Sequence, residues 1–206
     1  MNQSRRVVIT GSIATGKSTV TRMLIERGYP VLDADRIAGG IYEDHALLSR
    51  VRAHFGETVL TAEGKLDRKK LGERIFRDAK ERKVLNRMTH PVIIKRMLQE
   101  EKSVEGDLVF WDVPLYFEER DVLEPLIQPT ATVLVYATFE QQLQRLQIRD
   151  ALGYEEALER IKAQIPIEQK RKMADYILDN SRGIVDLSGQ LTELLPLLEA
   201  NRPYKI

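Results

Sequence analysis

The chain has 206 residues, contains no cysteine and carries 32 basic against 31 acidic side chains, a net charge of +1. This length suits one domain, or one domain with insertions, that buries a sizeable core. The near-neutral charge argues against a general nucleic-acid or membrane-surface binder, and the lack of cysteine excludes disulfides and thiolate metal sites. No apolar run approaches the about 20 residues of a membrane span, and no signal-peptide core precedes the first strand. We therefore expect a cytoplasmic protein that binds neither membranes nor nucleic acid.

The first predicted element is a strand, loop and helix that carry a phosphate-binding motif. Residues 6–10 are short, apolar and β-branched, which predicts a buried strand. Residues 11–19 follow the pattern Gly, four residues, Gly, Lys and then Ser or Thr. Val20, Met23 and Leu24 recur at helical spacing behind it. A Gly-rich turn with an exposed lysine is the simpler alternative, but the flanking strand and helix favour a nucleotide site.

The chemistry of this loop depends on its backbone. Glycines allow successive N–H groups to point inward at phosphate oxygens, and the following helix N-terminus adds partial positive charge. We expect Lys17 to reach the outer phosphates and the Ser18 hydroxyl to join the coordination shell of a magnesium ion.

A second strand is predicted at residues 29–32, and two carboxylates, Asp33 and Asp35, follow it. Ligands of parallel α/β sheets bind at the carboxyl ends of strands, so these side chains should lie near the loop. Asp33 is the candidate to accept a proton from an attacking hydroxyl or to position magnesium. We expect Asp35 to act partly as a helix cap or turn residue.

Residues 36–101 show a mostly helical pattern with no convincing core strand, which is longer than an ordinary crossover connection. This indicates an inserted helical subdomain, with a helix break at residues 89–91. Residues 65–87 hold ten basic and four acidic side chains. They form either a solvated helix face or a surface for an anionic second substrate, and His90 by itself is more typical of a structural residue.

The third predicted strand, residues 108–111, ends at Asp112, which is either a magnesium-associated acid or a turn residue. Residues 132–136 predict the fourth strand, and Thr138 with Gln141 predicts a capping box for the next helix. In that helix Arg145 and Arg149 lie four residues apart on one face. They either stabilise charge on a transferred phosphoryl group or make ordinary surface salt links.

The last part of the chain is predicted to return to the sheet once more. Residues 155–169 are helical and polar, and residues 176–178 predict a fifth strand. Leucines at helical spacing from Leu187 to Leu198 predict a final amphipathic helix, which Pro196 should bend or shorten.

Taken together, these features resemble the dephospho-CoA kinase family along nearly the whole chain. The loop alone is shared by many kinases and GTPases. The loop together with the later motifs, in their order along the chain, is much more specific for this family. The segments that carry the resemblance are residues 11–19, 33–38, Leu85-Asn86, His90-Pro91, 112–118, Gln142, Arg145, Arg149-Asp150, Gln164 and 174–180.

The resemblance implies an α/β fold of the P-loop NTPase type: a five-stranded parallel sheet flanked by helices, with a helical substrate subdomain and a lid. We expect a core at about 1–38, 103–138 and 172–206, the helical insertion at about 39–102 and the lid at about 139–171. The family transfers the γ-phosphoryl group of ATP to the ribose 3′-hydroxyl of dephospho-CoA, the last step of coenzyme A synthesis. ATP and dephospho-CoA are thus the expected partners, with Mg²⁺ as cofactor and a monomer favoured.

The resemblance also implies roles for individual residues. The expected catalytic residues are Asp33 as general base, Lys17, Arg145 and Arg149. The expected ATP-binding residues are Gly11, Ala14, Thr15, Gly16, Lys17, Ser18, Thr19 and Asn180. The expected substrate-binding residues are Asp33, Arg74, His90 and Asp112. Ser18 is the expected magnesium ligand, with Asp112 as a candidate second ligand.

The chain departs from the commonest loop of the family at two glycine positions, which hold Ser12 and Ala14, and Tyr116 replaces the usual leucine. Since small residues fit such a loop, we expect ATP binding with a stiffer backbone.

Two other functions compete with this one. Another small-molecule kinase would share the loop, which does not specify the acceptor. A GTP-dependent switch is disfavoured because the chain has no Asn-Lys-x-Asp guanine signature.

Overall fold

The computed structural model describes residues 5–200, apart from the side chains of Arg77 and Ala79. The chain divides into two compact units: Met1–Asp33 with Ser103–Ile206, and Ala34–Lys102. The predicted ends of the core, residues 1–4 and 201–206, lie outside the described residues.

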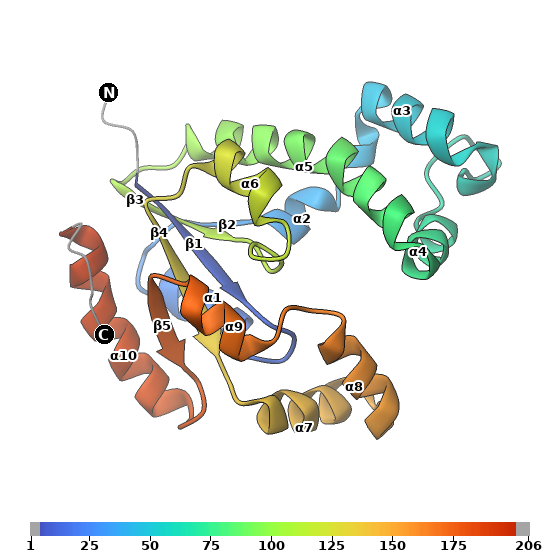
Figure 1. Ribbon diagram of the computed structural model, residues 1–206. Helices are drawn as coiled ribbons and strands as arrows, with labels where there is room; N and C mark the ends of the chain where they lie inside the picture. The colour runs from blue at the N-terminus through green and yellow to red at the C-terminus, as the bar shows by residue number, and fades with distance from the viewer. Residues whose placement is uncertain (1–4, 201–206) are drawn as a thin grey trace. The chain divides into compact units, whose positions relative to one another are not determined.

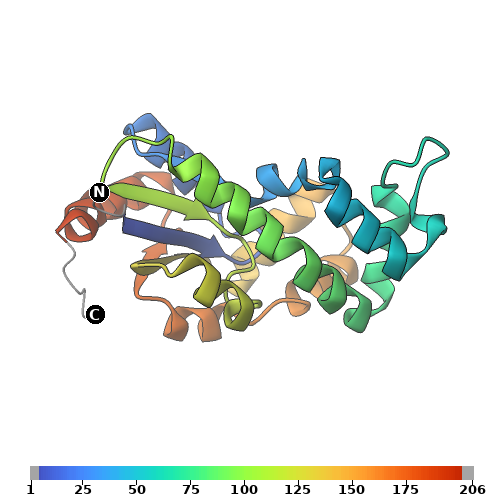
Figure 2. The ribbon, with the colours of Figure 1, turned by 90° about the horizontal axis from the view of Figure 1, so that it is seen from above.

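The first unit is built on a five-stranded sheet whose strand order is β2-β3-β1-β4-β5. The strands are β1 (Arg5–Gly11), β2 (Val31–Asp33), β3 (Leu108–Asp112), β4 (Ala131–Tyr136) and β5 (Tyr176–Asp179). Every neighbouring pair is parallel, and the arrows of β1 and β3 lie side by side and point the same way in Figure 2. The predicted five-stranded parallel sheet is confirmed, and β1, which leads into the phosphate loop, lies at its centre.

Helices flank this sheet, as the burial of β3 and β4 along their whole lengths requires. The helices are α1 (Lys17–Glu26), α6 (Arg120–Ile127), α7 (Phe139–Asp150), α8 (Tyr154–Lys162), α9 (Ile167–Met173) and α10 (Ile184–Glu199) (Figure 1). Alternate strand residues such as Val7 and Phe110 form one core cluster with Leu24 of α1 and Leu191 of α10. Side chains alternate between the two faces of a strand and recur every 3.6 residues along a helix, so each element turns one apolar face to this cluster.

The second unit is helical. It contains α2 (Ala34–Ala38), the short 3₁₀ helices η1 (Ile41–Glu43) and η2 (Glu57–Val59), α3 (His45–Phe55), α4 (Arg68–Arg77) and α5 (Ala79–Glu101). Aspartates begin the three longer helices: Asp44, Asp67 and Asp78 each accept hydrogen bonds from backbone N–H groups of the first turn. Helix α5 contacts α2, α3 and α4, so it is the element around which this unit packs.

The predicted helix break at residues 89–91 is wrong. Helix α5 runs for 23 residues with Pro91 inside it, and the interruption comes earlier, at Asp78, between α4 and α5 (Figure 2). Proline removes one N–H donor, but Ile94 and Met97 beyond it are buried in the unit. Their packing keeps the chain helical, and the Thr89 hydroxyl bonds back to the Leu85 carbonyl at 3.0 Å.

Three further boundaries differ from the predictions. Asp35 lies within the first turn of α2 rather than before it, where its charge favours the helix dipole. Pro166 divides the helix predicted at 155–169 into α8 and α9, since it holds the N-cap position of α9. Pro196 lies inside α10 and does not shorten it, because the helix continues to Glu199 with Leu194, Leu195 and Leu198 buried around the proline; the predicted bend stays a prediction.

Candidate active site

The phosphate loop connects β1 to α1 and takes a tightly curved path. Ala14 and Gly16 both have positive φ, 61° and 93°, and α1 begins at Lys17. The N–H groups of Thr19 and Val20 donate to the Gly16 carbonyl. The N–H groups at the start of any helix lack intrahelical acceptors, so this end of α1 suits an anion.

Close packing explains the glycine at the start of the loop. A Cβ on Gly11 would lie 2.6 Å from Thr15 Oγ1 and 3.2 Å from the Val135 carbonyl oxygen. The buried Thr15 hydroxyl itself donates to the Ser12 carbonyl at 2.9 Å. Ala14, in contrast, holds a left-handed conformation that costs a non-glycine residue about 1–2 kcal/mol.

Two carboxylates lie at the ends of the strands beside the loop. Asp33 of β2 is the register partner of Asp112 of β3, and Asp112 is also paired in register with Ile9 of β1. The Lys17 ammonium forms an ion pair with Asp112 Oδ1, and Asp112 is buried. The structure thus brings Lys17 into contact with Asp112, and Asp33 lies opposite Asp112 on the neighbouring strand.

Asn180 lies against the phosphate loop and is held on several sides. Its side-chain Nδ2 donates to the Thr15 carbonyl at 2.9 Å, and its backbone N–H donates to the Tyr136 carbonyl at 2.8 Å. A Cβ on Gly16 would collide with the Asn180 amide. Asn180 therefore braces the loop from the end of β5.

The two predicted arginines of α7 have different environments. Arg145 is half-buried and donates from NH2 to the Asn180 carbonyl at 2.9 Å, next to the phosphate loop. Arg149 is exposed and makes two hydrogen bonds to Asp150, of 2.7 and 3.0 Å. These bonds lower the pKa of the Asp150 carboxyl below its ordinary value. In this conformation Arg145 lies at the loop, and Arg149 is engaged in a surface ion pair.

A buried ion pair between Glu118 and Lys170 also lies against the loop. The Lys170 ammonium is fully buried, 2.6 Å from Glu118 Oε1, and donates to the Gly11 carbonyl at 3.4 Å. Burial lowers the pKa of Lys170, and Glu118 partly offsets that shift. Close by, Gln164 Oε1 accepts a hydrogen bond of 2.9 Å from the Ile13 N–H.

The oxygen donors at the site match the preferences of a magnesium ion. Mg²⁺ binds hard oxygen ligands and usually takes one or two carboxylates together with substrate phosphates. Ser18 supplies a hydroxyl in the first turn of α1, and Asp33 and Asp112 supply carboxylates at neighbouring strand ends. Within residues 5–200 no group of three or more metal-ligating acids, histidines or cysteines is present.

Arg74 and His90 belong to the helical unit. Arg74 of α4 donates to the Phe55 carbonyl at 2.7 Å, and its guanidinium lies 5.1 Å from the centroid of the Phe55 ring. It also lies 3.7 Å from Glu81 Oε2. His90 lies midway along α5 and is half-buried. Arg74 therefore already packs against its own unit, and its predicted role toward substrate stays a prediction.

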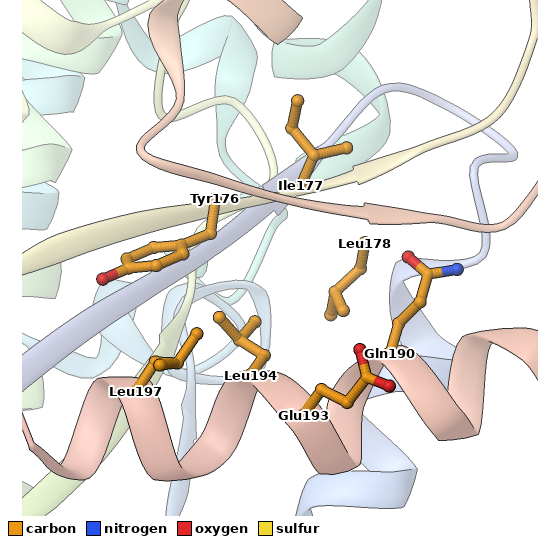
Figure 3. Close-up of a pocket in the computed structure, with 7 residues that line it drawn as sticks. All are labelled: Tyr176, Ile177, Leu178, Gln190, Glu193, Leu194 and Leu197. Carbon is orange, nitrogen blue, oxygen red and sulfur yellow. The ribbon is translucent and has the colours of Figure 1, made fainter. Parts of the chain in front are cut away.

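A pocket lies apart from these residues, between β5 and α10. It is lined by Tyr176, Ile177 and Leu178 of the strand and by Gln190, Glu193, Leu194 and Leu197 of the helix (Figure 3). Its volume is about 130 Å³, below the roughly 300 Å³ at which small-molecule sites begin. We do not assign it a ligand.

Sequence reasoning missed the contacts that brace the loop from outside. Glu118 and Gln164 stood in the segments that carry the family resemblance, but no role was predicted for either. Lys170 is followed by Arg171 and Lys172, a run typical of a solvated helix face, so no sequence signal marked it as buried.

Comparison with known proteins gives consistent matches over most of the chain. A sequence profile described as dephospho-CoA kinase matches residues 5–186. The dephospho-CoA kinase of Listeria monocytogenes serotype 4b is 39% identical over 202 residues, which cover 96% of this chain and 99% of the relative.

Two solved structures extend the similarity to three dimensions. TT1252 from Thermus thermophilus superposes with a TM-score of 0.80 at 33% identity and covers 94% of this chain and 97% of its own. Dephospho-CoA kinase from Campylobacter jejuni gives a TM-score of 0.68 at 31% identity, with coverage of 96% and 98%. Among the described residues, no helix has the length and apolar character needed to span a membrane.

Proposed function

Because this chain belongs to the dephospho-CoA kinase family, we propose that it transfers the γ-phosphoryl group of ATP to the ribose 3′-hydroxyl of dephospho-CoA. The observation that carries the proposal is the arrangement around the central strand. A phosphate loop follows β1, and Asp33 and Asp112 end the two strands next to it on one side. We further propose that the protein acts as a monomer in the cytoplasm.

The donor half of the proposed site is the phosphate loop. N–H groups of the loop and of the first turn of α1 hold the phosphate oxygens of ATP, and Lys17 neutralises charge on the outer phosphates. Lys17 now pairs with Asp112, so nucleotide binding exchanges a carboxylate partner for phosphate oxygens. This exchange keeps the ammonium paired in both states, which limits its desolvation cost.

The acceptor half is Asp33. In the proposed step the ribose hydroxyl oxygen forms a bond to the γ-phosphorus, the bond from that phosphorus to the β,γ-bridging oxygen breaks, and Asp33 receives the hydroxyl proton. Ser18, with Asp112 as a second candidate, would hold the magnesium ion, which would supply positive charge at the ATP phosphates. ADP then leaves with the bridging oxygen.

The two arginines of α7 are proposed to act on the transferred group from the lid, residues 139–171. Arg145 already lies beside the loop through its bond to Asn180. Arg149 has to release Asp150 before it reaches a phosphate, so its contribution requires a change of partner. Lid closure of this kind excludes water, which favours transfer to the acceptor over hydrolysis.

The acceptor is proposed to bind through the helical insertion as well. Its segment from residue 65 to residue 87 is rich in basic side chains, and dephospho-CoA carries a diphosphate. Arg74 and His90 are the proposed contacts, and charge-assisted bonds from arginine suit phosphate oxygens.

A coupled assay with ATP, magnesium and dephospho-CoA tests this function directly. We expect formation of ADP and coenzyme A with dephospho-CoA, and no comparable turnover with nucleosides, nucleoside monophosphates or shikimate as acceptors. Absence of turnover with dephospho-CoA at saturating magnesium would refute the proposal, and faster turnover with another acceptor would reassign the substrate.

The role of Asp33 is tested by Asp33→Asn. General-base catalysis contributes about 10²–10⁴-fold, so kcat should fall by about a hundredfold or more while the Kd for ATP changes little. Asp35→Asn is the matched control, since Asp35 lies two residues further on in α2, and its kcat should stay near that of the wild type. A near-normal kcat for Asp33→Asn would remove Asp33 from the base role.

A further inference from the structure

We propose that Glu118 and Lys170 are positioning residues that set the conformation of the phosphate loop from outside the nucleotide site. Lys170 comes from α9, and Glu118 from the segment between β3 and α6. Neither residue lies in the motif at positions 11–19. The proposal rests on the nucleotide-binding half of the proposed function and is independent of the acceptor.

The first step of the argument concerns the Gly11–Ser12 peptide. Lys170 Nζ donates to the Gly11 carbonyl, which fixes the direction of that oxygen. In a planar trans peptide the C=O and the following N–H point in opposite directions. An ammonium held on the Gly11 oxygen therefore also sets the direction of the Ser12 N–H at the start of the loop.

The second step concerns how the ammonium is held. Lys170 has an exposed fraction of 0%, and its charge is paired with Glu118 Oε1 at 2.6 Å. The same Glu118 oxygen accepts a 3.2 Å bond from the Ile165 N–H. Glu118 thereby ties α9, and the turn that precedes it, to the segment between β3 and α6, and this leaves the lysine little freedom to leave Gly11.

The third step concerns energy. A buried ion pair must overcome the desolvation of both charges, and it often stabilises a fold no better than apolar residues of the same size. Here Glu118 Oε2 is also buried and has no hydrogen-bond partner within residues 5–200. Net stability is therefore a poor explanation for the pair, and placement of the Gly11 carbonyl is the better one.

A neighbouring contact points the same way. Gln164 Oε1 accepts the Ile13 N–H, so a second backbone group of the loop is held by the segment between α8 and α9. Residues 164–170 thus contact the loop at Gly11 and Ile13. A shift of this segment would therefore move backbone groups of the loop, which links the last part of the proposed lid, residues 139–171, to the proposed nucleotide site.

The test is the double variant Lys170→Met/Glu118→Gln, which removes both charges and keeps an acceptor for the Ile165 N–H. Three measurements are made on the full chain: the thermal unfolding midpoint, amide hydrogen exchange of residues 11–16, and the Kd for ADP. We expect a folded protein whose loop amides exchange faster and whose Kd for ADP rises about tenfold, as loss of a charge-assisted bond predicts.

The matched control is Arg120→Met/Glu124→Gln. It removes one cation and one anion from a half-buried pair within α6, whose N–O distance is 2.8 Å, and should leave loop exchange and ADP binding unchanged. Wild-type loop exchange and ADP affinity in a folded Lys170→Met/Glu118→Gln protein would overturn the proposal. Loss of its fold would overturn it as well, because the pair would then hold the fold rather than the loop. None of the three measurements uses dephospho-CoA, so they remain decisive if the proposed acceptor is wrong.

Discussion

Tyr116 buries its whole side chain, and its hydroxyl has no hydrogen-bond partner among the residues that the structure describes. Burial is the main cause that raises the pKa of this phenol to about 12, with smaller contributions from Glu124 and Asp175 in the same direction and from Arg120 against them. A buried hydroxyl without a partner carries a desolvation cost, which a phenylalanine of the same shape avoids.

We therefore predict that Tyr116→Phe raises the free energy of unfolding by about 1 kcal/mol at pH 7. The gap should widen with alkaline pH. The unfolded phenol ionises near its ordinary pKa of 10, and the folded one near 12, so the wild type loses stability as the pH rises from about 10 to 12.

Urea unfolding of both proteins at pH 8 and pH 10.5 measures this difference. Tyr154→Phe is the control, because Tyr154 is exposed and its replacement removes the same hydroxyl without relieving burial. A constant difference between Tyr116→Phe and the wild type across this range would show that Tyr116 does not account for the alkaline loss.

Lys17 and Lys170 show what could be predicted at this scale. Lys17 stands in a motif whose spacing encodes its task, so its place at the loop followed from the sequence. Lys170 is placed by a long-range contact with Gly11, 159 residues away, and by an ion pair with Glu118. Local pattern carries no information about such a pairing.

At the scale of elements, the strands were more predictable than the helix ends. The five strands are short apolar runs, and each was located within about two residues because a parallel sheet covered by helices is built from strands rich in apolar residues. Helix boundaries at prolines were misjudged. Tertiary packing around Pro91 and Pro196 outweighs the lost hydrogen bond, whereas Pro166 does begin a new helix.

Helix α5 therefore carries an unfavourable residue in its interior, and we predict that Pro91→Ala stabilises the protein. Proline destabilises a helix interior by about 3 kcal/mol relative to alanine. Proline also restricts the unfolded chain, which offsets up to about 1 kcal/mol of that destabilisation. A net gain of about 2 kcal/mol is expected in urea unfolding.

Lys95→Ala on the same helix is the control, since lysine and alanine have similar helix propensity and Lys95 is exposed. Its effect should stay within about 0.5 kcal/mol. A loss of stability in Pro91→Ala would mean that the packing around α5 depends on the shape of the proline ring.

At the scale of the whole molecule, the site residues are drawn from distant parts of the sequence. β1 pairs with β3 and β4, whose residues lie about a hundred or more positions later, and Asn180 follows β5. The family and the parallel sheet could be predicted from ordered motifs. The contacts that brace the loop could not be predicted, because they depend on how α9 and the end of β5 pack next to β1.

This long-range pairing predicts that nucleotide binding appears late on the folding chain. Ribosome-arrested chains that expose only residues 1–162 lack Gln164, Lys170 and Asn180, and should not retain an ATP analogue. Chains that expose residues 1–200 should retain it as the released protein does. Retention by the shorter chain would show that the loop needs none of these three braces.

The central position of β1 has a consequence for synthesis of the protein. At about 5–20 residues per second, roughly 10 to 30 seconds separate emergence of the phosphate loop from emergence of its last brace, Asn180. For more than half of that interval the loop is attached to a strand whose sheet neighbours, β3 and β4, have not yet emerged. The residues proposed to bind nucleotide are therefore among the first to leave the ribosome, and we expect them to form a complete site only when Asn180 has emerged.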